Sequence, residues 1–574
     1  MSEQRPWLRF TTLIAVVALV ASACGAQTTP TPGVTPTAPA GTPTAVPTPA
    51  IKTGGTLVVA LPSDINRTDP ALIDDSNSSY VMQAVMESLV GLKPGTTGDL
   101  APSLAKSWTV SADALTYTFT LQEGVKFHDG TDFNAAAVKF NYERWINLPD
   151  SYGDLEYTYY VDTVLGRGDT TIIESITTNG DYEVTIKLKR PFSPFLLTQT
   201  LVVFAISSPK ALEDGKASDP VFENNKYATG GPPAMVGTGP FKFKSWTLGD
   251  RVEVEKFADY WNKAAGGPYL DGIVFRPISD STATLNALED GSIDFTQILA
   301  PTDANSAAQN PDLQNIDRGS SCNLLAVDMN QKHKPFDNLK IRQAVAYSIN
   351  KQRIIDNLYA GQAVPGDNWM PPGTVTYKPL NLPTYNVDTA KQLIADSGVP
   401  EADLAFEYWY FPEARPYMPD PKGVAESVLA DLEAAGFKPQ PKTEPFRPDF
   451  LAHEAAGLFP IFQIGWTCDW QGPDNFLNTA FFGYRTRSDG TFGPNEEFEY
   501  KNDEMWAAMD KALTSSDAAE QLAEWQKVQD FLAADMPSVP LLSSKPPAAG
   551  AIYVKGFVPA GNLIEYFTNV WLDK

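Results

Sequence analysis

Asp469 is the residue whose type and surroundings point most directly to chemistry. It follows an apolar run, residues 461–464, that predicts a short buried strand ending at Gly465. A turn-forming Gly-Pro-Asp sequence at 472–474 comes directly behind it. A carboxylate at the end of a buried strand is destabilising unless a cation or hydrogen-bond donors meet it. The segment therefore predicts a ligand-binding carboxylate, and a turn aspartate that caps local backbone is the open alternative.

The neighbours of Asp469 predict the walls of such a site. Trp466 and Trp470 flank it, and Thr467 adds a hydroxyl close by. We interpret the two indoles as walls for the side chains of a ligand. Pro62 and Ser63 follow another predicted strand, and loops at strand ends commonly face ligands.

A second candidate group, Arg415 and Tyr417, lies upstream on a proline-rich loop. The loop follows an aromatic strand at 408–410 and precedes a predicted helix. The planar guanidinium donates a bidentate fork and the phenol adds a third donor, a combination that suits a carboxylate. An interdomain salt bridge is the equally open alternative for Arg415.

Composition limits the classes of function. The chain has 574 residues, 43% hydrophobic and 20% charged, which is enough for two or three globular domains. Its net charge of −25 repels phosphate, and its basic residues form no continuous run. We therefore expect no nucleic-acid partner.

An enzyme is the rival class. Asp469 paired with Asp474 or with Asp129 would resemble a glycosidase dyad. The three histidines, however, lack metal-ligand spacing, and the sequence holds no nucleophile elbow and no P-loop. We expect a binding protein without a cofactor or a metal, and a purely structural surface protein remains a third option.

The N-terminus predicts export. Arg5 and Arg9 precede an apolar stretch at 13–20 that is too short to span a membrane and is typical of a signal peptide over residues 1–23. The small residues before Cys24 resemble a bacterial lipobox, and ordinary cleavage near Ala23 is the alternative. Residues 24–52 are rich in threonine and proline and predict an extended tether. Lipidation of Cys24 would leave an even number of cysteines, as expected in an oxidising compartment.

The remaining sequence alternates between the two regular periodicities. Strict alternation at 116–121 predicts a half-buried strand, with 182–188 as its partner. Between them we expect a helix capped by Asp132, followed by a polar loop that extends to about Thr171. Helices are predicted at 423–435 and at 517–534. Strands at 406–411 and 459–464 alternate with helices, which is the layer pattern of an α/β protein.

Several motifs together resemble the dipeptide- and oligopeptide-binding proteins of ABC importers, in the peptide/nickel solute-binding family, family 5. The resemblance covers nearly all of residues 54–574. The motifs that carry it are Gly-Trp-Thr-x-Asp at 465–469, Gly-Pro-Asp-Asn-Phe at 472–476, Arg-Pro-Tyr-x-Pro at 415–419, Leu-Ala-Pro-Ser-Leu-Ala at 100–105, Gly-Val-Lys-Phe-His-Asp-Gly at 124–130, Gly-Thr-Gly-Pro-Phe at 237–241 and Phe-Asp-Asn-x-x-x-Arg-Gln-Ala at 336–344.

The resemblance implies a fold and a set of domains. The expected fold is α/β, a two-lobed periplasmic-binding-protein-like clamp of type II, cluster C, with an extra inserted α+β domain. The expected domains are lobe I from residues 53–98, 231–318 and 542–574, inserted domain II from 99–230, and lobe III from 319–541.

The resemblance also implies roles for single residues. Asp469 would bind the α-ammonium group of a peptide, and Arg415 with Tyr417 its α-carboxylate. Some relatives join the regions of Cys322 and Cys468, so a disulfide between these two cysteines is expected. The implied function is that of a monomeric, lipid-anchored protein outside the cytoplasm that delivers dipeptides or short peptides to an ABC permease. Glutathione, haem, a metal chelate or an oligosaccharide are the alternative ligands on the same scaffold.

Overall fold

The computed structural model describes residues 50–73, 75–153, 158–318, 322–486, 491–562 and 566–574. The predicted signal peptide, Cys24 and nearly all of the tether lie outside the described residues. Every element below lies within residues 51–574, which form one compact unit.

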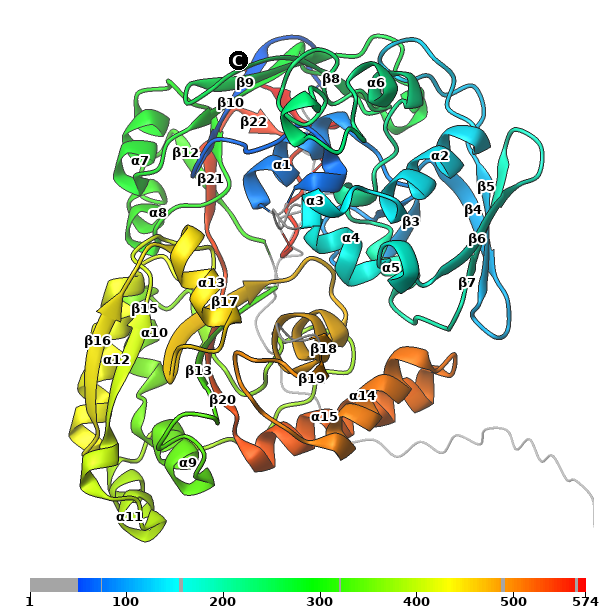
Figure 1. Ribbon diagram of the computed structural model, residues 1–574. Coiled ribbons are helices and arrows are strands. Elements are labelled where there is room, and N and C mark those ends of the chain that lie inside the picture. Colours follow the sequence, from blue (N-terminus) through cyan, green and yellow to red (C-terminus); the bar gives the residue numbers. More distant parts are fainter. Residues whose placement is uncertain (1–49, 74, 154–157, 319–321, 487–490, 563–565) are drawn as a thin grey trace, which may run out of the picture. The chain divides into compact units, whose positions relative to one another are not determined.

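The largest sheet of the described residues has seven strands and is covered on both faces (Figure 1). Leu57, Val59 and Leu61 alternate along β1 and pack into the same apolar core as α1, whereas Ala60 faces the helices α7 and α8. In spatial order the strands are β12 (Leu313–Ile316), β21 (Ala548–Ala551), β11 (Phe295–Thr296), β1 (Thr56–Leu61), β10 (Gly272–Pro277), β9 (Arg251–Lys256) and β8 (Phe241–Thr247). The helices are α1 (Ser76–Val85), α7 (Ser281–Glu289) and α8 (Pro301–Ala307).

An antiparallel sheet of four strands is formed within the segment expected as an insertion. Its order is β4 (Ala105–Val110), β5 (Thr116–Leu121), β7 (Glu183–Leu188) and β6 (Ile173–Thr178), and α2 (Ala135–Ile146) packs against it. The predicted pairing is confirmed, because Phe119 of β5 lies opposite Val184 of β7. The predicted polar loop is wrong in part. It contains α3 (Asp150–Gly153) and α4 (Tyr159–Val164), and α4 forms because Val161 and Val164 bury one face of it.

The second large sheet has six strands in the described part of the chain. Its order is β14 (Ala363–Pro365), β20 (Ser538–Ser544), β13 (Asn323–Met329), β17 (Ile461–Thr467), β15 (Ala405–Tyr410) and β16 (Lys438–Thr443). Every residue of β13 and β20 is buried, as expected for central strands covered on both faces. The longer helices around this sheet are α9 (Leu339–Ser348), α10 (Lys351–Leu358), α11 (Val387–Ser397), α12 (Pro421–Ala435), α14 (Asp503–Thr514) and α15 (Ala518–Asp535).

Smaller elements complete the unit. They are the strand pairs β2 (Val90–Leu92) with β3 (Leu100–Pro102), β18 (Tyr484–Thr486) with β19 (Phe492–Pro494) and β22 (Val554–Lys555) with β23 (Trp571–Leu572), and the short helices α5 (Phe195–Thr198), α6 (Pro209–Asp214) and α13 (Leu451–Ala455). None of the helices that the structure describes is both long enough and apolar enough to cross a membrane.

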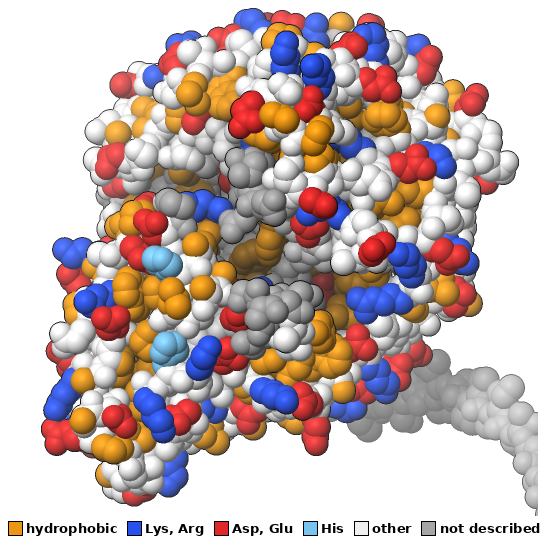
Figure 2. Space-filling model, in the orientation of Figure 1, with side chains coloured by type: hydrophobic (Ala, Val, Ile, Leu, Met, Phe, Trp, Pro, Cys, Tyr) orange, Lys and Arg blue, Asp and Glu red, His pale blue; other side chains and the backbone are white. Residues whose placement is uncertain are grey.

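Charged side chains are mixed on the surface that Figure 2 shows. Described lysines and arginines lie among aspartates and glutamates on this face and are not gathered in one area. Mixed charge of this kind supports solubility.

The strand that leads to Asp469 runs further than its sequence predicts. β17 continues through Gly465 to Thr467, which pairs with Asn323 of β13, so the expectation that it ends at Gly465 is wrong. A Cβ atom at Gly465 would lie 2.6 Å from Cδ2 of Tyr417 and even closer to the carbonyl oxygen of Leu324. The glycine therefore makes room for the Tyr417 ring against the strand and does not end it.

We predict that Gly465→Ala destabilises the protein by about 1–3 kcal/mol, because the added methyl group meets backbone as well as the ring. Chemical denaturation measures the change. Gly98→Ala is the matched control, since its Cβ would lie 3.8 Å from Oε1 of Gln471, an ordinary contact. An equal effect of the two substitutions would contradict the role assigned to Gly465.

Candidate ligand-binding site

A cavity of about 1490 Å³ brings together residues from distant parts of the sequence. Seven of the eight residues predicted to bind a ligand line it. These are Pro62, Ser63, Arg415, Tyr417, Trp466, Thr467 and Asp469. The eighth, Trp470, does not, and neither Asp474 nor Asp129 of the alternative glycosidase dyads lines the cavity.

Asp469 lies two residues beyond the end of β17 and is held by two donors. The Tyr160 hydroxyl donates to Oδ1 at 2.7 Å, and the Asn475 amide donates to Oδ2 at 3.0 Å. Asn475 in turn accepts from the Asp469 backbone N–H and from the Trp466 indole N–H, both at 3.1 Å. This network fixes the direction of the carboxylate and uses one donor on each of its oxygens.

Burial nevertheless dominates the ionisation of this carboxyl group. It raises the pKa of Asp469 to about 6, and the hydrogen bonds from Asn475 and Tyr160 only partly oppose the rise. A cation beside Asp469 would stabilise the ionised form further. The side chain is therefore poised to bind a positive charge near neutral pH.

Arg415 and Tyr417 lie together at another part of the cavity wall. The backbone of Arg415 exchanges two hydrogen bonds with Met418, at 3.0 and 2.9 Å, which closes the loop tightly. Its guanidinium stacks over the Phe446 ring, 3.5 Å from the centroid, and its Nε has no hydrogen-bond partner among the described residues. Burial raises the pKa of Tyr417 to about 12, so its phenol stays protonated and able to donate.

Thr467 adds a further polar group to this wall. Its Oγ1 is buried and has no hydrogen-bond partner within the described ranges. Arg415 and Thr467 thus line the cavity, and each has a buried polar atom without a partner among the described residues, which is unusual for buried donors.

The prediction that Trp470 forms a wall of the site is wrong. This indole is 1% exposed and packs in the apolar core that also holds Leu57 and Tyr80. Its N–H donates to Oδ2 of Asp474 at 2.9 Å, and burial raises the pKa of Asp474 to about 7. A large apolar ring gains more from complete burial than from half-exposure at a cavity, provided that its N–H finds an acceptor.

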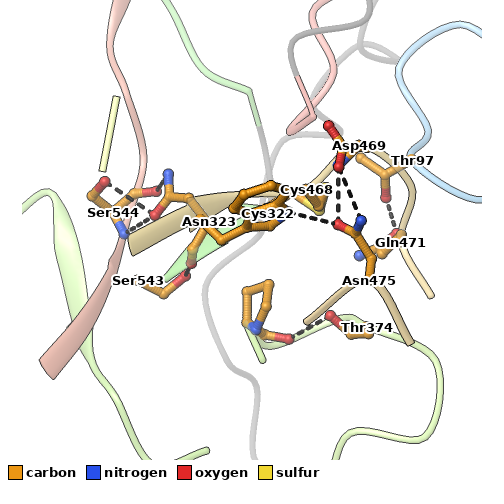
Figure 3. The surroundings of a disulfide bond; sticks show 12 residues. Thr97, Cys322, Asn323, Thr374, Cys468, Asp469, Gln471, Asn475, Ser543 and Ser544 are labelled. Carbon is orange, nitrogen blue, oxygen red and sulfur yellow. Dashed lines mark hydrogen bonds between the residues drawn. A yellow bond between two sulfur atoms is a disulfide. The ribbon is translucent and has the colours of Figure 1, made fainter. Parts of the chain in front are cut away.

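A disulfide braces the Asp469 segment (Figure 3). Cys322 and Cys468 are bonded, with their Cα atoms 5.4 Å apart, and the Cys468 N–H donates to the Cys322 carbonyl at 2.7 Å. Next to Cys322, the side chain of Asn323 binds the backbone of Ser544 at 2.8 and 2.9 Å. The residue before Asp469 is thereby tied to β13 and, through it, to β20.

Sequence reasoning missed Tyr159, Tyr160 and Asn475. The first two lie on α4 and line the cavity, and Tyr159 packs beside the Trp466 indole with the ring centroids 6.3 Å apart. A signal was present, because adjacent tyrosines are out of place in a polar loop. Asn475 belongs to a π-helix, Asn475–Phe482, and lies six residues beyond the carboxylate it binds.

The sequence and the fold define the class of protein. Residues 99–488 match the bacterial extracellular solute-binding proteins, family 5, and the chain belongs to this family. It is a solute-binding protein of an ABC transporter that works outside the cytoplasm, and not an enzyme. The predicted family and the α/β periplasmic-binding-protein fold are both confirmed.

Individual relatives differ in what they bind. Heme-binding protein A of Haemophilus influenzae is 28% identical over 521 residues, 88% of this chain and 90% of the relative. Glutathione-binding protein GsiB of Escherichia coli is 30% identical over 525 residues, 87% and 91% of the two chains. A solved structure of the periplasmic binding protein DppA from Helicobacter pylori, in complex with the peptide STSA, is also similar to this chain. The two structures superpose with a TM-score of 0.75 at 28% sequence identity, over 91% of this chain and 99% of the DppA chain.

The raised pKa of Asp469 predicts pH-dependent binding of a cationic or zwitterionic ligand. Below about pH 6 the ligand must displace a proton, so the affinity should fall about tenfold between pH 7.5 and pH 5. Titration calorimetry at both pH values measures the change. Asp469→Asn should remove this dependence of the affinity on pH. If the affinity of the variant falls as steeply as that of the wild type, another group causes the pH dependence.

Proposed function

We propose that this protein captures dipeptides or short peptides outside the cytoplasm and delivers them to an ABC import permease. The observation that carries the proposal is a single cavity with a carboxylate and a guanidinium on its wall. Asp469 suits a ligand ammonium group, and Arg415 with Tyr417 suits a ligand carboxylate. A peptide carries both groups at its ends.

The relatives support a peptide ligand, and glutathione is the alternative most similar to a peptide. The similar DppA structure holds a peptide, and glutathione, named for GsiB, is itself a peptide-like molecule with an ammonium group and carboxylates. The cavity is larger than the roughly 300–1,000 Å³ of common small-ligand sites, so peptides longer than two residues fit its size. Haem lacks an ammonium group and would leave Asp469 without its cation.

The sheets support the expected division into domains. The seven-stranded sheet uses strands from the proposed lobe I segments 53–98, 231–318 and 542–574, and the four-stranded sheet lies in the proposed domain II, 99–230. The six-stranded sheet uses strands of the proposed lobe III, 319–541, except that β20 continues past residue 541 to Ser544. We propose that these parts close around the ligand. Small-angle scattering should give a smaller radius of gyration with a saturating peptide, and an unchanged radius would count against closure.

We also propose a lipid anchor at Cys24, followed by the Thr/Pro-rich tether. Cys24→Ser should move the protein from the membrane fraction to the soluble extracytoplasmic fraction, because two acyl chains supply stable attachment and the tether alone supplies none. Fractionation and immunoblotting measure the distribution. Equal membrane association of the two forms would show that the anchor lies elsewhere.

A thermal-shift screen tests the ligand class directly. Dipeptides, tripeptides, glutathione, haem and oligosaccharides are compared at equal concentration, and a ligand at 100 times its Kd should stabilise the protein by about 2.7 kcal/mol. Stabilisation by haem or by oligosaccharides alone would replace the peptide proposal.

Variants at the two ends of the site should lose affinity selectively. Asp469→Asn leaves the ligand ammonium unpaired and Arg415→Ala leaves its carboxylate unpaired, and losses at such groups run to about 2–5 kcal/mol, or some 30-fold to several thousand-fold. The Asn variant should no longer discriminate against N-acetylated dipeptides, and the Ala variant should no longer discriminate against dipeptide amides. Titration calorimetry measures both effects. A wild-type affinity that is indifferent to both modifications would refute the two-ended site.

A further inference from the structure

Two glutamates on the cavity wall have no part in the two-ended site. Glu454 lies on α13, and Glu497 follows β19. Glu454 is only 7% exposed, and its side chain makes no hydrogen bond or ion pair with the residues that the structure describes. An unpartnered carboxyl group that is almost fully buried and borders a cavity is destabilising in the absence of a ligand.

The surroundings of Glu454 carry an excess of acidic groups. Glu497 accepts from the Asn495 amide at 3.0 Å and lies 3.9 Å from the guanidinium of Arg485, whose side chain is 41% exposed and also donates to the Thr479 carbonyl. Burial raises the pKa of Glu454 well above its usual range, and the nearby Glu497 and Asp328 raise it further, whereas only Arg485 lowers it. One partly solvated arginine thus acts on both glutamates, and Asp328 adds a further carboxyl group near Glu454.

Both glutamates line the same cavity as the two ends of the proposed site. Glu454 acts on Tyr417, which lies beside Arg415 at the carboxylate end. Both glutamates also act on Tyr159, which interacts with Asp469 at the ammonium end. Because all of these groups line one cavity, a ligand held at both ends can bring a side chain to Glu454 and Glu497.

We propose that Glu454 and Glu497 form a subsite for a basic side chain of the ligand, so that the preferred peptides contain lysine, ornithine or arginine. The inference rests on the proposed peptide function and narrows it to a substrate class. An organic cation fits better than a metal ion, because the described residues hold no group of three or more His, Cys, Asp and Glu side chains arranged to bind one.

The basic side chain would act by ionising the glutamates. An ammonium group beside Glu454 favours its charged form, so a basic ligand drives the release to solvent of any proton that this carboxyl holds. A neutral side chain of equal length fills the same space and releases none. Proton release thus separates charge recognition from simple filling of the cavity.

The test compares lysine with norleucine, which has the same carbon chain but lacks the terminal ammonium group. Ala-Lys and Lys-Ala are titrated against Ala-norleucine and norleucine-Ala by calorimetry at pH 7, in two buffers of different ionisation enthalpy. The wild type should prefer a lysine peptide by at least about tenfold and release more protons with it. Glu454→Gln and Glu497→Gln, which keep side-chain volume, should each reduce the preference to about threefold or less, and Glu454→Gln should abolish the extra proton release.

Glu426→Gln is the control, since Glu426 is an exposed helix residue paired with Lys422, and it should retain the wild-type preference. Thermal unfolding of each variant checks that it folds. Equal affinity of the wild type for lysine and norleucine peptides, with dependence on both termini intact, would overturn the subsite and leave the peptide function standing. A preference that survives in both Gln variants would also overturn it. Failure of every peptide to bind would overturn the function and the subsite together.

Discussion

The site depends on how a buried carboxylate is kept ionisable at the end of a hydrophobic strand. β17 delivers Asp469 into a setting that favours its neutral form, and the two donors from Asn475 and Tyr160 restore only part of the lost hydration. Because part of the lost hydration of the Asp469 carboxylate is not replaced, binding of a cationic ligand beside it is favourable. The same reasoning applies to Arg415, whose guanidinium is stacked on an aromatic ring and has an Nε without a protein partner among the described residues.

Rigid surroundings make this electrostatic arrangement specific. The disulfide at Cys468 and the Asn475 network hold the carboxylate from two sides, and Gly465 allows the Tyr417 ring to pack directly on the strand. Preorganised groups of this kind lose little entropy when a ligand binds. Both ends of the site are thus positioned by one strand and its neighbours.

Local sequence predicted the elements whose signals are local. The alternation of residues 116–121, the helix ended by Gly436 and the polar residues at strand ends all depend on neighbours in the chain, and the structure agrees with them. Gly465 was misinterpreted because the ring that requires a glycine there belongs to Tyr417 on a separate loop. Trp470 was misplaced for a related reason, since its type predicts burial but not the core in which it is buried. The contact between Tyr160 and Asp469 is likewise set by tertiary structure.

The location of the polar groups has a kinetic consequence. Asp469, Arg415, Tyr417 and Glu454 all belong to the stretch of chain that builds the six-stranded sheet, whereas Tyr160, Pro62 and Ser63 reach the cavity from other parts of the unit. In the proposed closure, a ligand with two charged ends makes its main contacts on one surface before the other parts meet it. The association rate then reflects docking on an accessible surface, and the residence time reflects how long the remaining contacts keep the ligand enclosed.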